Sequence, residues 1–302
     1  MTISGVLPVI PTPMKDGAFD AASLRRFLDH MLPFVDGFTL LGSTGEAPSM
    51  STAERMEIAE QALAMTPDDK RVVVGVTDTA IGESIRLARH AGEHGAAGVL
   101  CASPYYFPNT SRGLGEYLEA LADATDVEIV FYDNPTPTQT VVAAEQIVEY
   151  ARRIPRLNTV KLTDHALEKI PVWQDAGLQV HAGDDPILFR FLRAGVDGAM
   201  VIAPAVFPAA FREVWDRRAV GDLPGALEVF SEEIAPFLHV FGLGDEIATS
   251  KAILADVGVF ASAETRLPLH ATDADRRELL IQAYRLCTQR TEQRTGVPVL
   301  SA

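Results

Sequence analysis

The sequence predicts a (β/α)8 barrel, or TIM barrel, followed by a C-terminal helical appendage. Short apolar or β-branched runs alternate with longer segments of helical period from residue 5 to about residue 220. Eight such units fit a barrel of this kind, whose typical size is about 250 residues. The main alternative is an open doubly wound sheet, but no G-x-G-x-x-G motif follows the first predicted strand.

The predicted strands are short and apolar, as expected for strands buried on both faces. In chain order they span Val6–Ile10, Phe38–Leu41, Arg71–Val76, Gly98–Cys101, Glu128–Tyr132, Thr159–Leu162, Gln179–Ala182 and Gly198–Ile202. The predicted helices between them span Ala21–Phe34, Thr52–Ala64, Ile81–His94, Gly113–Ala124, Ala143–Arg152, Leu167–Asp175, Pro186–Ala194 and Pro208–Arg217.

Three further helices are predicted after the eighth unit, at Leu223–Phe241, Glu246–Val257 and Ala274–Gln293, with no strand between them. No long linker rich in Pro, Gly or Ser separates them from the barrel near Gly221. We therefore expect a barrel domain of residues 1–221 and a helical region of residues 222–302 that packs on it.

The composition limits the functional classes. A hydrophobic content of 47% in 302 residues supports a substantial core, and a net charge of −15 argues against nucleic acid or an anionic membrane as partner. No signal peptide or membrane-spanning run is apparent, and the two cysteines form no C-x-x-C pair. We expect a cytoplasmic protein.

Lys161 is the most informative residue, since the chain has only five lysines. It lies near the end of the apolar run Leu157–Leu162. Burial removes the hydration of an ammonium and so favours the neutral amine, which attacks carbonyl carbons. The alternative is that Lys161 reaches the rim of the barrel or pairs with a carboxylate such as Asp164.

Other unusual residues follow the predicted strands, at the end where barrels of this kind carry catalytic groups. The segment Gly42–Glu46 offers two hydroxyls beside glycines, which suits a carboxylate, although an ordinary capped turn has the same composition. Tyr132 could shuttle protons at the barrel mouth or simply pack its ring there. Together with Lys161, these residues favour Schiff-base chemistry on a 2-oxo acid.

Histidines supply a second set of candidates. His90 and His94 match an H-x-x-E-H zinc pattern, but Gly92 and Gly95 suggest the end of a barrel helix, so the pattern is interpreted as structural. His165 and His181 fall near the predicted mouth, where capping or core packing is the simpler interpretation.

The motifs also resemble a known family. GSTGE (42–46), SPYY (103–106), YDNP (132–135), VK (160–161), AGDD (182–185) and RLPL (266–269) occur in the order seen in the dihydrodipicolinate synthase/N-acetylneuraminate lyase family of class I pyruvate-type aldolases and lyases. The resemblance spans essentially the whole chain. It implies a (β/α)8 barrel with C-terminal helices, a homotetramer or dimer, and substrates that are a 2-oxo acid and an aldehyde. It implies no cofactor beyond a covalent imine through Lys161.

The resemblance also implies catalytic roles. Lys161 would form the imine with the keto group of pyruvate or a related 2-oxo acid. Tyr132 would protonate and deprotonate the intermediates, and Ser43 occupies the relay position between Tyr132 and Tyr106. In dihydrodipicolinate synthases the tyrosine matching Tyr106 comes from a neighbouring subunit.

The same resemblance implies binding roles around the imine. Thr44 and its backbone, with Ser43 and Gly45 in the same motif, would hold the substrate carboxylate. The main-chain carbonyl near Met200 would face the bound 2-oxo acid.

Two departures concern the second substrate. Dihydrodipicolinate synthases place a carboxylate-binding arginine where this chain has Pro137, which argues against aspartate semialdehyde. Thr163 resembles instead the Lys-x-Thr of neuraminate lyases and sugar-acid aldolases, and Asp185, after Gly183, matches their hydroxyl-binding aspartate. Pro186, however, replaces the acidic residue that follows it in those enzymes.

Several functions remain open from the sequence. The first is a Schiff-base aldolase or dehydratase acting on a 2-oxo acid, with an aldehyde or sugar-acid-type second substrate. The others are 4-hydroxy-tetrahydrodipicolinate synthase proper, a homologue that binds 2-oxo acids without turnover, and a metal-dependent hydrolase on the same barrel.

Overall fold

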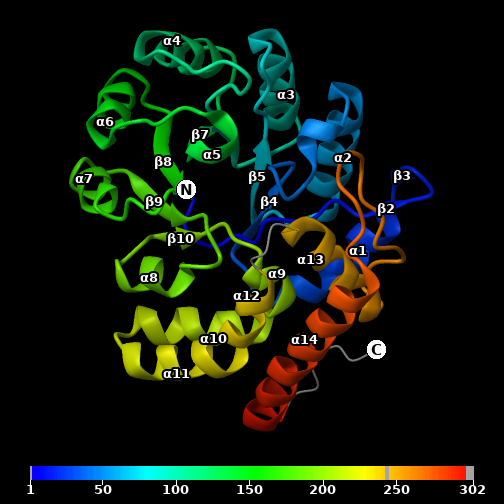
Figure 1. Cartoon of the computed structure of the whole chain (residues 1–302). Coiled ribbons are helices and arrows are strands. Elements are labelled where there is room, and N and C mark those ends of the chain that lie inside the picture. Colours follow the sequence, from blue (N-terminus) through cyan, green and yellow to red (C-terminus); the bar gives the residue numbers. More distant parts are fainter. Residues whose placement is uncertain (1, 242–244, 297–302) are drawn as a thin grey trace.

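The computed structural model describes residues 2–241 and 245–296 and confirms the predicted barrel (Figure 1). Eight parallel strands lie at its centre, in the order β1-β10-β9-β8-β7-β6-β5-β4. They span β1 Gly5–Val6, β4 Gly37–Leu40, β5 Arg71–Gly75, β6 Gly98–Ala102, β7 Glu128–Asp133, β8 Leu157–Leu162, β9 Gln179–Ala182 and β10 Gly198–Ala199.

Helices surround the strands in chain order, so each strand is covered on its outer face (Figure 1). They span α1 Ala21–Met31, α2 Thr52–Met65, α3 Ile81–Glu93, α4 Ser111–Ala122, α6 Ala144–Arg153, α7 Lys169–Asp175, α8 Leu188–Arg193 and α10 Pro208–Ala219. The loops add a hairpin, β2 Met14–Lys15 with β3 Ala18–Phe19, and the short helices η1 Ala47–Ser49, α5 Pro135–Thr138 and α9 Ala203–Val206.

The N-terminal segment closes the barrel. The amides of Gly5, Leu7 and Val9 donate to carbonyls of the β10 strand and its flanks, at 2.9–3.1 Å. On the other side, Ile10 N donates to Thr39 O and Thr39 N donates to Pro8 O, both at 2.9 Å, and Val9 bridges Thr39 in parallel. The segment from Gly5 to Ile10 therefore joins the first and last strands of the sheet.

The first and eighth strands are shorter than predicted. Pro8 faces β4 and has no N–H to donate there, so the hydrogen bonding on that side of the segment is irregular after Val6. After Ala199, the amides of Ile202 and Ala203 donate to the carboxylate of Asp185 and begin helix α9 instead of extending the strand.

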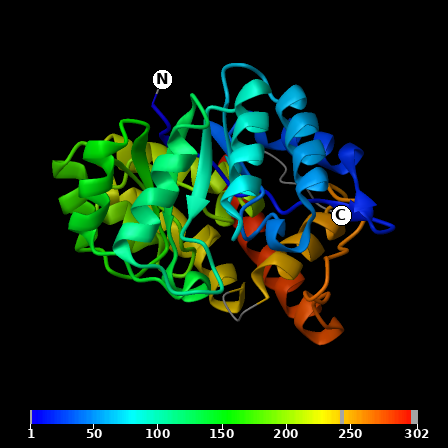
Figure 2. The same ribbon diagram turned by 90° about the horizontal axis from the view of Figure 1, so that it is seen from above.

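The C-terminal helices are α11 Leu223–Glu233, α12 Ala235–Phe241, α13 Glu246–Asp256 and α14 Ala274–Thr295. They follow α10: α11 lies beside α10, α13 lies by α9, and α14 lies against α11, α12 and α13 (Figures 1 and 2). The single helix predicted over Leu223–Phe241 is wrong, because it breaks at Ile234, two residues before Pro236. The domain boundary at residue 221 stays a prediction, and 242–244 and 297–302 of the predicted helical region lie outside the described residues.

Candidate active site

Lys161 lies at the C-terminal end of β8 and is 5% exposed. Its strand neighbour in register is Tyr132 on β7, and the Lys161 Nζ lies 4.1 Å from the centroid of the Tyr132 ring. The Lys161 amine therefore lies beside the Tyr132 ring, as predicted, because adjacent parallel strands end at the same edge of the sheet.

Three lysines are buried, and their surroundings differ. Lys169 Nζ donates to Asp133 Oδ2 at 2.8 Å and to Asp164 Oδ2 at 2.9 Å. Burial opposes the charge of Lys169, but these carboxylates outweigh it and raise its pKa. Lys251 forms an ion pair with Glu46. Within the described part of the chain, no carboxylate pairs with Lys161, so Asp164 is not its counter-ion.

The loop Gly42–Glu46 follows β4 and is held in a tight conformation. Leu41 and Glu46, at its two ends, both adopt left-handed backbone angles, with φ of 54° and 58°. Glu46 N donates to Ser43 O at 3.0 Å, and Thr12 Oγ1 donates to Gly45 O at 2.7 Å. A Cβ on Gly45 would lie 2.8 Å from Leu41 N, so glycine is required there.

Glu46 fastens this loop to the C-terminal region. Its Oε1 pairs with Lys251 of α13, and its Oε2 accepts a hydrogen bond from Arg266 N at 2.6 Å. Lys251 Nζ also donates to Glu264 O at 2.7 Å. Both charged side chains are fully buried. The sequence showed the GSTGE and RLPL motifs but gave no sign that Lys251 joins them.

A cavity of about 210 Å³ opens above Lys161. Its wall includes the predicted residues Ser43, Thr44, Tyr132, Lys161, Gly183, Asp185 and Met200. Asp184 and, from α13, Glu246 also line it, and among the described residues no arginine does. The cavity therefore combines one lysine amine with hydroxyl and carboxylate oxygens.

A second cavity, of about 220 Å³, lies on the other side of Ser43 and Tyr132, which line both. Its wall is mainly apolar, with Leu41, Leu100 and Pro137 among its residues. Pro137 sits in α5, and no arginine lines this cavity either. Burial raises the pKa of Tyr105, another residue of this wall.

Asp185 and Thr163 make contacts within the protein. The carboxylate of Asp185 accepts hydrogen bonds from Ile202 N at 2.9 Å and Ala203 N at 2.7 Å. Burial raises its pKa to about 6, against the effect of these donors. Thr163 Oγ1 donates to Gly183 O at 3.1 Å, and Thr163 lines neither cavity. The role of both residues toward substrate stays a prediction.

Tyr106 and Gly45 line neither cavity. Tyr106 is 77% exposed and stacks edge-on against Phe107, which is 73% exposed, with ring centroids 4.9 Å apart. Arg112, the arginine nearest to Tyr106 in sequence, pairs with Glu116 at 2.7 Å on the surface of α4. Arg112 lines neither cavity of its own chain.

His165 and His181, which were predicted to fall near the mouth, have different surroundings. His181 is fully buried, and its Nε2 hydrogen-bonds Ile3 O at 3.0 Å. Burial lowers the pKa of His181 to about 4, which fits the core interpretation. His165 is exposed and lies 3.1 Å from Asp184 Oδ2.

Comparisons with known proteins agree with this architecture. The chain matches the Dihydrodipicolinate synthetase family over residues 2–285. The 4-hydroxy-tetrahydrodipicolinate synthase of Thermosipho melanesiensis is 29% identical over 287 residues, covering 94% of this chain and 98% of that protein. Among the described residues, no helix is both long and apolar enough to cross a membrane.

Solved structures show the same fold. The 4-hydroxy-tetrahydrodipicolinate synthase of Methylacidiphilum fumariolicum superimposes with a TM-score of 0.90 at 22% identity, covering 97% of this chain and 99% of that one. The dihydrodipicolinate synthase of Thermotoga maritima gives 0.88 at 27% identity, covering 93% and 97%. The chain therefore belongs to the dihydrodipicolinate synthetase family of aldolase-type lyases.

Proposed function

We propose that the chain is a Schiff-base lyase in which Lys161 forms an imine with pyruvate or a related 2-oxo acid. The observation that supports this most is the buried amine of Lys161, which faces a cavity and lacks a carboxylate partner in the described residues. The other two buried lysines each have one. A buried amine that faces a cavity and forms no ion pair is placed to attack the carbonyl carbon of a substrate.

The proposed chemistry starts with attack of the Lys161 nitrogen on the keto carbon. The resulting carbinolamine loses water and becomes an iminium, whose positive nitrogen accepts electrons from the neighbouring bond. In the cleavage direction, the C–C bond beyond the adjacent carbon breaks, which releases an aldehyde and leaves an enamine. Protonation of the enamine and hydrolysis then return the 2-oxo acid and the free amine.

Tyr132 is proposed to move the protons in these steps. Its ring lies against the Lys161 amine, and it lines both cavities together with Ser43. Tyr106 is exposed on its own chain, and we propose that it completes the relay from a second copy, in the homotetramer or dimer that the resemblance implies. No external cofactor enters this scheme.

The carboxylate of the 2-oxo acid is proposed to bind at the loop Gly42–Glu46. Ser43 and Thr44 both line the Lys161 cavity, and their hydroxyls and backbone amides are donors of the kind that carboxylates accept. The left-handed residues at the loop's ends and the Glu46 ion pair hold these donors in place before substrate arrives.

We propose a hydroxylated, sugar-acid-type second substrate. Asp184, Asp185 and Glu246 line the Lys161 cavity, and carboxylates accept hydrogen bonds from hydroxyls but repel a second carboxylate. An adduct of pyruvate with aspartate semialdehyde carries two carboxylates. Among the described residues no arginine lines either cavity, so the second carboxylate would have no bidentate partner.

The names of relatives favour a second candidate. The Thermosipho melanesiensis protein is a 4-hydroxy-tetrahydrodipicolinate synthase, which suggests condensation of pyruvate with aspartate semialdehyde. A panel of 2-oxo-3-deoxy sugar acids, assayed by pyruvate release, and aspartate semialdehyde, assayed by condensation, separates the two. Trapping at Lys161 without turnover of any panel member would indicate the binding-only homologue.

The imine itself is tested by borohydride reduction in the presence of pyruvate. We expect one carboxyethyl adduct on Lys161, located by peptide mass spectrometry, and no adduct in Lys161→Met. Lys15→Met, at an exposed lysine of the β2–β3 hairpin, is the matched control and should be labelled like the wild type. Absence of an adduct with every 2-oxo acid tried, or labelling that persists in Lys161→Met, would refute the proposal.

A further inference from the structure

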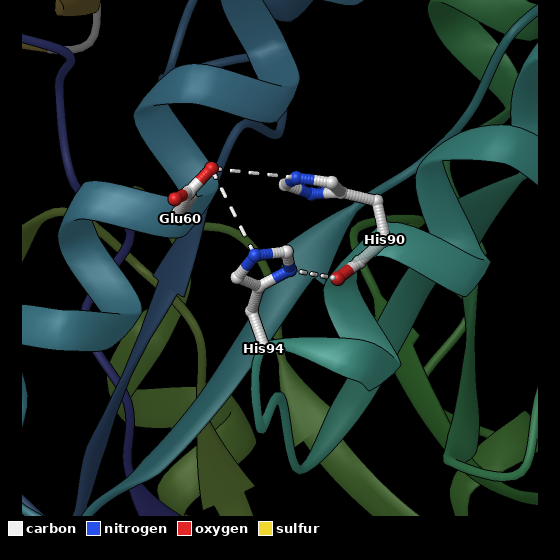
Figure 3. Close-up of side chains that lie close together, drawn as sticks. All are labelled: Glu60, His90 and His94. Carbon is white, nitrogen blue, oxygen red and sulfur yellow. Dashed lines mark hydrogen bonds and ion pairs between the residues drawn. The ribbon is translucent and has the colours of Figure 1, made fainter.

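Glu60, His90 and His94 converge on the outer surface of the barrel, between α2 and α3 (Figure 3). Glu60 comes from α2, His90 from the last turn of α3, and His94 is the residue at the C-terminal end of α3. One ligand atom from each lies within 4.8 Å of the other two. In the described parts of the chain, this is the one such group of three His, Cys, Asp or Glu side chains.

The spacing of the three groups fits coordination better than direct hydrogen bonding. Glu60 Oε2 lies 3.7 Å from His90 Nε2 and 3.8 Å from His94 Nε2, both longer than a hydrogen bond. Tetrahedral zinc with bonds of about 2.0–2.1 Å separates its ligand atoms by about 3.3–3.4 Å. Glu60 is more than half exposed, so a small rotation of its side chain can bring its carboxylate from the observed separations to those of a zinc site.

The ring nitrogens of the two histidines are arranged so that both Nε2 atoms face Glu60. His94 Nδ1 lies 2.8 Å from His90 O, where it can donate, and this tautomer leaves the lone pair of Nε2 directed at Glu60 (Figure 3). His90 Nδ1 has no hydrogen-bond partner in the described structure, so no protein group prevents Nε2 from presenting its lone pair.

We propose that Glu60, His90 and His94 bind one Zn²⁺ ion, with water as the fourth ligand. Two imidazoles and one carboxylate are a donor set that zinc accepts. The ion would join α2 to α3. It would lie on the outer surface of these helices, where Glu60 and His94 are partly exposed, and away from the two mouth cavities, which none of the three residues lines. The ion would therefore stabilise the barrel wall and take no part in the imine chemistry.

The H-x-x-E-H pattern alone does not describe this site. The glutamate of that pattern, Glu93, is not in the cluster, and the third ligand comes from the preceding helix. The sequence indicated a structural role for these histidines, because Gly92 and Gly95 suggested the end of a barrel helix. The third ligand, Glu60, is brought to them by the packing of α2 against α3.

The test is a titration of chelator-treated, full-length protein with zinc chloride by isothermal calorimetry. We expect one Zn²⁺ per chain in the wild type. Glu60→Gln and His94→Ala should each weaken the affinity by about tenfold or more, since loss of even a supporting contact costs about 10–100-fold. Both side chains lie at the surface, so these variants should fold, which circular dichroism would verify.

Matched controls are available on the same chain. Glu57→Gln removes an exposed carboxylate one turn earlier on α2, and His270→Ala removes an exposed histidine elsewhere. Both should bind zinc like the wild type, and zinc should raise the melting temperature of the wild type and the controls but not of the ligand variants. No binding to the wild type, or equal binding to Glu60→Gln and His94→Ala, would overturn the proposal.

Discussion

The buried ion pair between Lys251 and Glu46 leads to a sharp prediction for Lys251→Met. Methionine approximates the length and shape of the lysine stem but has no charge. The substitution leaves the carboxylate of Glu46 buried, with the backbone N–H of Arg266 as its remaining donor. It also removes the hydrogen bond from Lys251 to Glu264 O.

The expected loss is about 3–5 kcal/mol of unfolding free energy, the cost of removing one partner from a buried pair. Burial lowers the pKa of Lys251 and Glu46 opposes this, so the charge of Lys251 depends on Glu46. The double variant Lys251→Met/Glu46→Gln has no unpaired charge. It should recover about 1–3 kcal/mol relative to Lys251→Met, which is a coupling of the size found for contacting residues.

Urea unfolding followed by circular dichroism measures these differences. Lys15→Met, at an exposed lysine, should stay within about 0.5 kcal/mol of the wild type. If Glu46 positions the carboxylate loop, Lys251→Met should also raise the pyruvate concentration needed for half-maximal trapping. Equal stability of Lys251→Met and Lys15→Met, or a double variant no more stable than Lys251→Met alone, would refute the role of this ion pair.

Three further predictions concern the barrel interior. Tyr132→Phe should still form the borohydride-trapped adduct but turn over about 10²–10⁴-fold more slowly in the aldol assay, and an unchanged rate would exclude Tyr132 as the proton carrier. The folded pKa of His181, about 4, lies below its ordinary value of 6.5, so its contribution to stability is present above pH 6.5 and is lost as pH falls toward 4. The control is His181→Gln, whose amide can keep the hydrogen bond to Ile3 O. Between pH 7 and pH 4 the wild type should lose about 3 kcal/mol more unfolding free energy than this variant. Parallel pH profiles of the two proteins would contradict this. Pro137→Arg should raise kcat/KM for aspartate semialdehyde by about tenfold or more through a charge-assisted hydrogen bond, and no gain would argue against Pro137 as the specificity position.

Most of the barrel could be predicted because its strands and helices have different apolar periods. The neighbourhood of Lys161 and Tyr132 was also predictable, since both end adjacent strands and the ends of parallel strands share one edge of the sheet. The break at Ile234 was missed, although Pro236 carried the signal for it.

Partner choice could not be read from the sequence. Asp164 is close to Lys161 along the chain, yet it pairs with Lys169. Glu46 and Lys251 meet only because the C-terminal helices pack against the barrel. These contacts depend on tertiary packing between distant segments, which apolar periodicity does not encode.

The closing segment Gly5–Ile10 has a consequence for how this chain can be cut or extended. Each of its sides completes a hydrogen-bonded ladder, one to β10 and one to β4. Without it, the sheet would have two free edges, whose exposed amides and carbonyls are templates for pairing with other chains. We therefore expect deletion of the first ten residues to expose both edges and to cause aggregation.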